Sequence, residues 1–155
     1  MLFRSDVPDP REVGAFRGEA GLEACRVQVA GSEAVPSGEV IEALGGFERT
    51  LRRVIEVLDE AYPAGTDLDI DGLAAAIDLA AWAHAEWVRI HPLANGNGRI
   101  ARIWANAVLM RYGLPPVVRL RPRPDSGYGR AAAAAMRGNW RPTALAIRRM
   151  LVDGG

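Results

Sequence analysis

Lysine is absent from this sequence, and each of its 19 basic residues is an arginine. A Walker P-loop needs a lysine at the phosphates, and Schiff-base enzymes need a lysine amine, so the sequence excludes both mechanisms. The 19 acidic residues balance the arginines to a net charge of zero. A chain with no net charge has no overall field to hold a polyanion, and we therefore do not expect nucleic-acid binding.

Cysteine and long apolar runs are also scarce. Cys25 has no second cysteine with which to form an internal disulfide or a Cys-x-x-Cys zinc site. No apolar run approaches the roughly 20 residues that span a bilayer, and the N-terminal segment lacks the apolar core of a secretory signal. We expect a cytoplasmic protein that does not associate with membranes.

The 155 residues are enough for one domain with its own core. Residues 1–24 are rich in proline, glycine and charge, and predict a loosely ordered N-terminal arm or short helix before a domain over residues 25–155. Residues 26–36 alternate around a small-residue turn and predict a short β-hairpin. The remainder follows helical spacing, so the expected fold is mainly α.

Apolar residues at intervals of three and four predict one helix or a broken pair between residue 40 and Pro63, with an interruption at Gly45-Gly46. Asp71 is the expected cap of a second helix, which Pro92 ends. Two shorter helices are expected over 128–136 and 142–152. The expected buried stripe of the second helix is Leu73, Ile77, Ala80, Ala81, His84, Trp87 and Val88. In the third helix, the residues that follow helical spacing are Ile100, Ile103, Trp104, Ala107, Val108 and Arg111.

The second and third helices are joined by His91-Pro92-Leu93-Ala94-Asn95-Gly96-Asn97-Gly98-Arg99, called here the glycine loop. Gly96 and Gly98 are expected to adopt positive φ angles, so that successive N–H groups line a concavity. The next helix adds the partial positive charge of its N-terminus, which suits a phosphate. A glycine-asparagine loop can also be a simple turn, so the side chains around it decide between the two readings.

Three side chains in and beside the glycine loop favour a catalytic phosphate site over a simple turn. Arg99 and Arg102 stand three apart on the first helical turn, where two permanently charged forks can grip two phosphates. The imidazole of His91 is suited to take a proton from an attacking hydroxyl near neutral pH. His84 lies on an apolar stripe and is expected to be structural, and a zinc site at His84 has no cysteine pair to complete it.

The glycine loop resembles the signature of the Fic family, His-Pro-Phe-x-(Asp/Glu)-Gly-Asn-Gly-Arg-x-x-Arg, and the resemblance extends over about residues 26–151. It implies a Fic-like helical bundle in which a β-hairpin flap, here residues 26–36, docks the target hydroxyl. It also implies transfer of AMP, or another phosphate-linked group, from a nucleoside triphosphate such as ATP to a hydroxyl of a protein or small molecule. The related Doc branch transfers the γ-phosphate, but Doc proteins usually carry lysine in place of Gly98.

The resemblance assigns a role to each site residue. His91 is the general base, and the nucleotide-binding residues are Gly96, Asn97, Gly98, Arg99, Arg102 and Tyr128. Tyr128 matches the wall of the base pocket, although a tyrosine in a short helix is equally often a packing residue. No segment of this sequence completes the inhibitory pattern (Ser/Thr)-x-x-x-Glu-(Gly/Asn), so any restraint is expected from a separate protein or from a weak metal site.

Two positions depart from the signature. Leu93 replaces the phenylalanine that anchors the loop in the core, and leucine fills much of that space. Asn95 replaces the acidic residue that binds Mg²⁺, and a neutral amide is a weaker ligand for this hard cation. Because of Asn95, a nucleotide-binding module with weak catalysis is the alternative to a transferase.

Overall fold

The computed structural model describes residues 14–120 and 127–153. Its elements are mainly helical: α1 (Val40–Ala61), α2 (Ile70–Ile90), α3 (Asn97–Arg111), α4 (Gly127–Ala135) and α5 (Arg141–Asp153). A hairpin of β1 (Gln28–Val29) and β2 (Ser32–Glu33) precedes them, and a short 3₁₀ helix, η2 (Ser37–Glu39), leads into α1. The structure thus confirms the mainly α bundle with a short β-hairpin.

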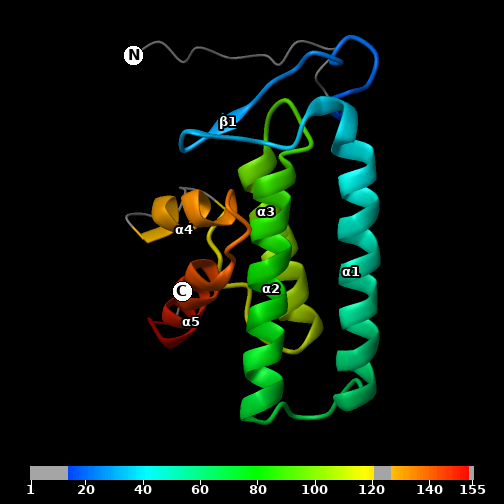
Figure 1. Cartoon of the computed structure of the whole chain (residues 1–155). Helices are drawn as coiled ribbons and strands as arrows, with labels where there is room; N and C mark the ends of the chain where they lie inside the picture. The colour runs from blue at the N-terminus through cyan, green and yellow to red at the C-terminus, as the bar shows by residue number, and fades with distance from the viewer. Residues whose placement is uncertain (1–13, 121–126, 154–155) are drawn as a thin grey trace.

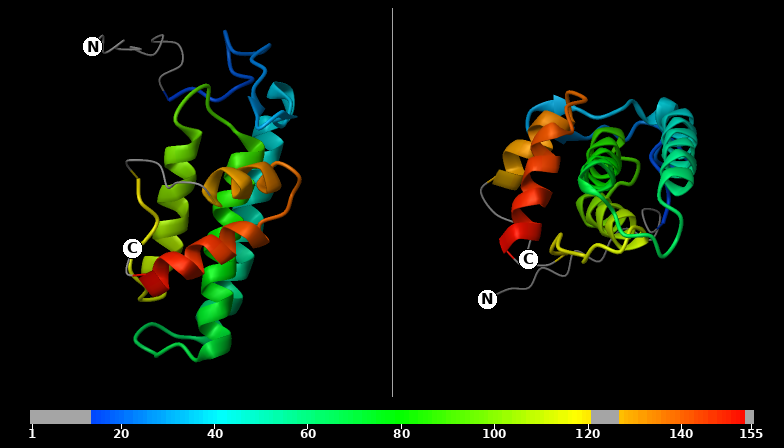
Figure 2. Two further views of the ribbon diagram at one scale, coloured as in Figure 1. Left: turned by 90° about the vertical axis from the view of Figure 1, so that its left-hand side faces the viewer. Right: turned by 90° about the horizontal axis from the view of Figure 1, so that it is seen from below.

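Helices α1, α2 and α3 run up and down beside one another, and the hairpin lies at the same end of the bundle as the α2–α3 loop (Figure 1). Helices α4 and α5 cover the side of α2 that is opposite α1 (Figures 1 and 2). Helix α2 is therefore enclosed by the others, which explains why its residues from Leu79 to Ala81 are all buried.

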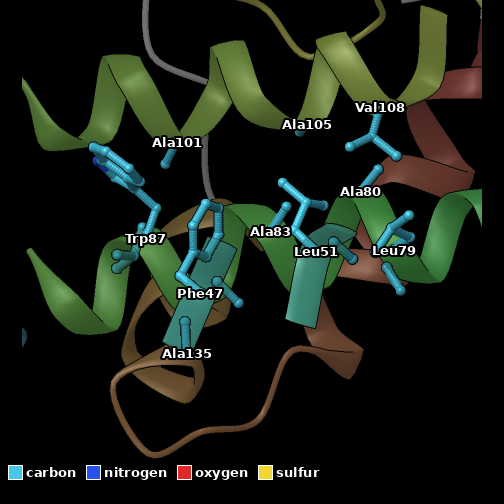
Figure 3. Close-up of a cluster of buried hydrophobic side chains, with 14 of the residues drawn as sticks. Phe47, Leu51, Leu79, Ala80, Ala83, Trp87, Ala101, Ala105, Val108 and Ala135 are labelled. Atoms are coloured by element: carbon cyan, nitrogen blue, oxygen red, sulfur yellow. The ribbon is translucent and has the colours of Figure 1, made fainter. Parts of the chain in front are cut away.

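The core forms where α1, α2 and α3 meet. Phe47 of α1 stacks on Trp82 at 5.4 Å between ring centroids and meets Trp87 and Trp104 edge-on at 5.7 and 5.4 Å. Small residues such as Ala83 and Ala105 face each other between α2 and α3 (Figure 3). Alanines at such a contact let two helix axes approach closely, so the direction of α2 is firmly set by its neighbours.

Helix α1 is continuous through Gly45-Gly46, so of the two predicted alternatives the single helix is confirmed. The predictions for α2 need two corrections. The cap of α2 is Asp69 rather than Asp71, because the Asp69 carboxylate accepts a hydrogen bond of 2.7 Å from the Gly72 N–H. Leu73 is 38% exposed, because it lies beside an open cavity of about 680 Å³ at the end of the bundle away from the glycine loop.

The buried face of α3 also differs from the predicted stripe. Ile103 and Ala107 are exposed, while the polar residues Arg102 and Asn106 are buried. The Asn106 amide donates to the Val118 carbonyl at 2.8 Å and accepts from its N–H at 3.0 Å. Hydrogen bonds of this kind, to the backbone of the segment after α3, allow a polar side chain to be buried. The assumption that polar residues face solvent therefore predicted the wrong face of α3 as the buried one.

The hairpin pairs Gln28 with Glu33 and Val29 with Ser32 in antiparallel register. Its two-residue turn has φ angles of 50° at Ala30 and 79° at Gly31, as in the type I′ turns that suit the twist of short hairpins. The hairpin is attached to the bundle by a hydrogen bond of 3.5 Å from the Val35 N–H to the Arg89 carbonyl. The predicted flap is therefore held against the last turn of α2.

Helices α4 and α5 agree with the two short helices predicted before and after Gly138-Asn139. None of the helices in the described ranges is long and apolar enough to cross a membrane. Of the predicted arm, residues 1–13 lie outside the described residues. The division into an arm over 1–24 and a domain over 25–155 stays a prediction.

The aromatic cluster around Phe47 generates the first prediction. Phe47→Ala should lower the free energy of unfolding by about 3–5 kcal/mol, because it removes a buried ring and leaves a cavity among three tryptophans. Val57→Ala is the matched control, since Val57 is on the same helix but 48% exposed. Urea unfolding measures both variants, and equal losses would contradict this description of the core.

Candidate active site

Helix α2 ends in a way that places His91 at the start of the glycine loop. His91 is the C-cap, with φ 51° and ψ 56°, and its N–H donates to the Trp87 carbonyl at 2.9 Å. This left-handed conformation is uncommon for a residue with a β-carbon. Pro92 follows and has no N–H to continue the helix. The backbone therefore turns sharply at the residue predicted to be the general base.

The His91 ring is oriented by the helix that precedes it. Its Nδ1 lies 3.2 Å from the Val88 carbonyl oxygen, which accepts a hydrogen bond when Nδ1 carries the proton. In the neutral ring, that tautomer leaves the lone pair on Nε2. Partial burial lowers the pKa of His91, the bond to Val88 opposes this effect, and the positive charge of Arg17 lowers the pKa further. The lowered pKa favours the neutral ring, which is the form that can accept a proton.

The glycine loop is closed internally by Asn97. This buried side chain accepts from the Leu93 N–H at 2.9 Å and donates to the Leu93 carbonyl at 2.6 Å. Gly96 is the N-cap of α3 and has a φ of 88°, which confirms the positive φ predicted there. Gly98 lies within the first turn of α3, so the positive φ predicted for it is wrong.

Helix α3 directs backbone donors and arginines toward the loop. The amides of Asn97 and Gly98 precede the first intrahelical bonds, which the Arg99 and Ile100 amides donate to the Gly96 carbonyl. Such early N–H groups, together with the positive helix end, suit an anion. A β-carbon on Gly98 would lie 3.4 Å from Nη1 of Arg102, so this guanidinium lies directly behind the loop.

The two arginines differ in their surroundings. Arg99 is exposed, whereas Arg102 is 7% exposed and donates from Nη2 to the Leu120 carbonyl at 3.0 Å. The buried Nε of Arg102 has no partner among the described residues. None of the ion pairs formed by residues 14–120 and 127–153 includes Arg102. Among the described residues, no carboxylate therefore compensates the charge of Arg102 beside the loop.

Tyr128 connects Arg102 with His84. The Arg102 guanidinium lies over the Tyr128 ring at 5.9 Å, and the Tyr128 hydroxyl is hydrogen-bonded to His84 Nε2. Burial, and next the charge of Arg102, lower the pKa of His84 to about 3. The structural role predicted for His84 agrees with this buried position. The place of Tyr128 in a base pocket stays a prediction.

Asn95 is the residue at which Mg²⁺ was expected. It is exposed at the tip of the glycine loop and offers a neutral amide. Within the described part of the chain, no group of three or more His, Cys, Asp or Glu side chains is placed to hold a metal ion. The protein donors thus fit Mg²⁺ poorly, with one weak oxygen ligand at the expected position.

Sequence reasoning missed Arg17, which lies in the segment predicted to be a loose arm. Its side chain is 1% exposed, and Nε donates to the His91 carbonyl at 2.6 Å. The neighbouring Phe16 forms an antiparallel bridge with Leu93 of the glycine loop. No periodic pattern marks Arg17, because its partners are backbone atoms, and two of them, in Ile90 and His91, lie more than 70 residues away in sequence.

The structure brings together a neutral histidine, a glycine loop at a helix N-terminus and a buried arginine, a combination typical of a phosphate-transfer site. The sequence profile of the Fic/DOC family matches residues 9–109. The chain therefore belongs to the Fic/DOC family.

Curated relatives agree with this assignment. "Protein adenylyltransferase Fic" of Nematostella vectensis is 55% identical over 42 residues, which are 27% of this chain and 10% of that protein. The protein of the same name from Drosophila melanogaster is 34% identical over 110 residues, which are 71% of this chain and 18% of that protein. The chain spans less than a fifth of the length of these two relatives.

The buried imidazole of His84 generates a prediction about pH. In the unfolded chain His84 has its ordinary pKa of 6.5, whereas in the folded protein its pKa is about 3. Between these two pH values the unfolded state therefore binds a proton that the folded state does not. The free energy of unfolding should therefore fall as the pH is lowered from 6.5 toward 3. Urea unfolding between pH 7 and 5 tests this before most carboxylates titrate.

Because the pKa of His91 is also lowered, it contributes in the same direction. His91→Gln isolates the contribution of His84, the one other histidine of the chain. NMR of the two imidazoles provides the independent reading: a His84 ring that titrates near 6.5 would contradict the buried, neutral assignment.

Proposed function

We propose that this domain transfers AMP from ATP to a hydroxyl group of an acceptor, with His91 as the general base. The observation that carries the proposal is the His91 ring, held by the Val88 carbonyl at the entrance of a glycine loop that begins a helix. Family membership and the printed name of the relatives, protein adenylyltransferase, support AMP as the transferred group.

In the proposed step, Nε2 of His91 takes the proton of the acceptor hydroxyl as its oxygen attacks the α-phosphorus of ATP. A new P–O bond forms to the acceptor, the bond between the α-phosphorus and the bridging oxygen breaks, and pyrophosphate leaves with that electron pair. The lone pair on Nε2 suits this role because Nδ1 is bound to Val88. The protonated His91 then returns its proton to solvent or to the leaving group.

The phosphates are assigned to the start of α3. The amides of Asn97 and Gly98 offer backbone donors, and Arg102 behind Gly98 offers a fixed positive charge. Arg99 is exposed on the first turn and can close over the outer phosphates. Fixed donors that face the charge developing during transfer lower the barrier without reorganising.

Mg²⁺, when bound with the nucleotide, would offset negative charge on the phosphates. Asn95 is the residue that would contact it, through a neutral oxygen. Arg102 and Arg99 are then the chain's own means of offsetting that charge. This weak metal position favours one second candidate, a nucleotide-binding module with little catalysis.

We assign acceptor docking to the flap, residues 26–36, which is attached to the last turn of α2 through Val35. This places the docked segment near His91. We also propose that any restraint of the site comes from a separate protein, because no described carboxylate pairs with Arg102. A carboxylate from such a protein could occupy the position of a phosphate next to Arg102.

The test of the proposed function is transfer of label to proteins and metabolites of a lysate from ATP labelled at the α- or the γ-phosphate. Label from the α-position supports AMP transfer, whereas label from the γ-position alone would indicate a Doc-like phosphotransferase. The other triphosphates and CDP-choline are run in parallel, with intact-mass analysis of products. ATP binding without transfer from any donor would favour the binding module.

His91→Ala gives the sharpest test of the mechanism. Removal of the base should lower the transfer rate by about 10²–10⁴-fold. Nucleotide affinity should stay nearly unchanged, because the assigned phosphate donors are on α3. The rate and the dissociation constant for ATP are measured together, with Arg53→Ala on the exposed face of α1 as control. Undiminished turnover in the His91 variant would reject the mechanism.

Asn95→Asp tests the metal position. A carboxylate is a stronger ligand for Mg²⁺ than an amide, so the variant should reach half-maximal rate at a lower Mg²⁺ concentration and transfer AMP faster. Asn139→Asp makes the same change of charge at an exposed residue between α4 and α5. Rates across a Mg²⁺ titration, with ATP and with CDP-choline, decide the matter. An unchanged or lower rate with both donors would favour the binding module.

A further inference from the structure

Arg17 is a buried arginine whose side chain is bonded entirely to backbone carbonyls. It donates to His91 at 2.6 Å, Val35 at 2.7 Å, Ile90 at 2.8 Å and Cys25 at 3.1 Å. Its own N–H donates to the Pro92 carbonyl at 2.7 Å. A guanidinium carries five donors in a rigid plane, so it can hold several acceptors in one fixed arrangement.

These acceptors belong to three separate segments. Ile90 and His91 are the end of α2, Val35 is the base of the flap, and Cys25 lies between the arm and the flap. The last carbonyls of a helix have no intrahelical partners and carry its partial negative charge. Arg17 satisfies two of them where the backbone turns left-handed at His91. A single side chain thus joins the candidate base to the flap.

Arg17 has no carboxylate partner among residues 14–120 and 127–153. A buried cation without a carboxylate depends on carbonyl dipoles for its stability. If Arg17 served packing alone, an uncharged side chain would fill the space without this penalty. Its position therefore points to a role that uses its donors and its charge.

We propose that Arg17 is a positioning residue, which holds the His91 ring and the flap in the relative arrangement that brings an acceptor hydroxyl to Nε2. This proposal rests on the proposed function, since it assumes His91 as the base and the flap as the docking site. Arg17 touches neither the nucleotide-binding amides nor Arg102 through any of its hydrogen bonds, so its contribution concerns the acceptor side of the reaction.

The charged side chains on the elements around His91 show which of them affects its pKa. On α2, the carboxylate of Glu86 is bonded to Arg89; on the flap, Glu33 pairs with Arg26 at 3.9 Å. Arg99 at the start of α3 is exposed to solvent. Arg17 on the arm is the charged side chain that lowers the pKa of His91, after the larger effect of burial. Removing it should raise the pKa of His91.

The experiment compares Arg17→Met, which removes charge and donors, with Arg17→Lys, which keeps the charge but cannot reach all four carbonyls. Arg52→Met is the matched control, because Arg52 is exposed on α1, where it pairs with Glu48 of the same helix. The first reading is the NMR titration of His91, which is simple because the chain has two histidines. It needs no turnover, so it stands even if the proposed function fails.

In Arg17→Met, the His91 titration and the acid limb of the pH–rate profile should both move to higher pH. Both Arg17 variants should lose roughly ten- to a hundredfold in kcat, as expected for a misplaced base, while KM for ATP stays near the parent value. Arg17→Lys should keep the parent titration of His91. Arg52→Met should match the parent in every reading.

An unchanged His91 titration in folded Arg17→Met, or an unchanged kcat in Arg17→Lys, would overturn the proposal. A loss of kcat that is fully explained by the unfolded fraction would overturn it as well. If Arg17→Met does not fold, the kcat and KM of Arg17→Lys decide alone. Failure of the proposed function has a different signature, because the parent protein would then transfer no label from the α-phosphate of ATP, or His91→Ala would transfer it at the parent rate.

Discussion

The enclosure of α2 determines the rest of this structure. Its alanines are largely buried, and α2 packs against α1, α3, α4 and α5, so substituting larger residues at the buried alanines would force those helices apart. Because α2 is packed on several sides, it can neither rotate nor shift along its axis, and the position of its last residue is fixed. The candidate base, His91, directly follows that last residue as the C-cap. Its position is thus a consequence of helix packing on α2 rather than of the loop alone.

The site then follows from how one helix ends and the next begins. His91 turns out of α2 in the left-handed region, Gly96 turns into α3 in the same region, and Asn97 ties the span between them to Leu93. The negative end of α2 and the positive end of α3 therefore lie close together. Arg17 occupies the first end and Arg102 lies behind the second. A group that accepts a proton is favoured by a negative potential and a bound anion by a positive one. The C-terminus of α2 supplies the first and the N-terminus of α3 the second.

Helical periodicity predicted each helix well, because apolar spacing reports which side of a helix is covered. It failed where polar residues are buried. Arg102 and Asn106 donate hydrogen bonds to backbone carbonyls of the segment after α3, and no local sequence pattern reveals these contacts. They lie on the buried face of α3, whereas Ile103, which was predicted to be buried, is exposed. The motif located the His91 loop and its arginines. Arg17 could not be predicted, since its acceptors are main-chain oxygens that any residue supplies.

The bonds between the arm and the glycine loop join residues more than 70 positions apart, whereas α1, α2 and α3 follow one another directly. Contacts of such long range carry the larger loop-closure entropy, and we expect them to form after neighbouring helices have paired. The helical core is then expected to assemble while the turn at His91 is still unfinished. In the native state, we expect the contacts of Phe16 and Arg17 with the site to open at a lower free energy than global unfolding. The stability of the fold and the population of a completed site are thus separate quantities in this chain.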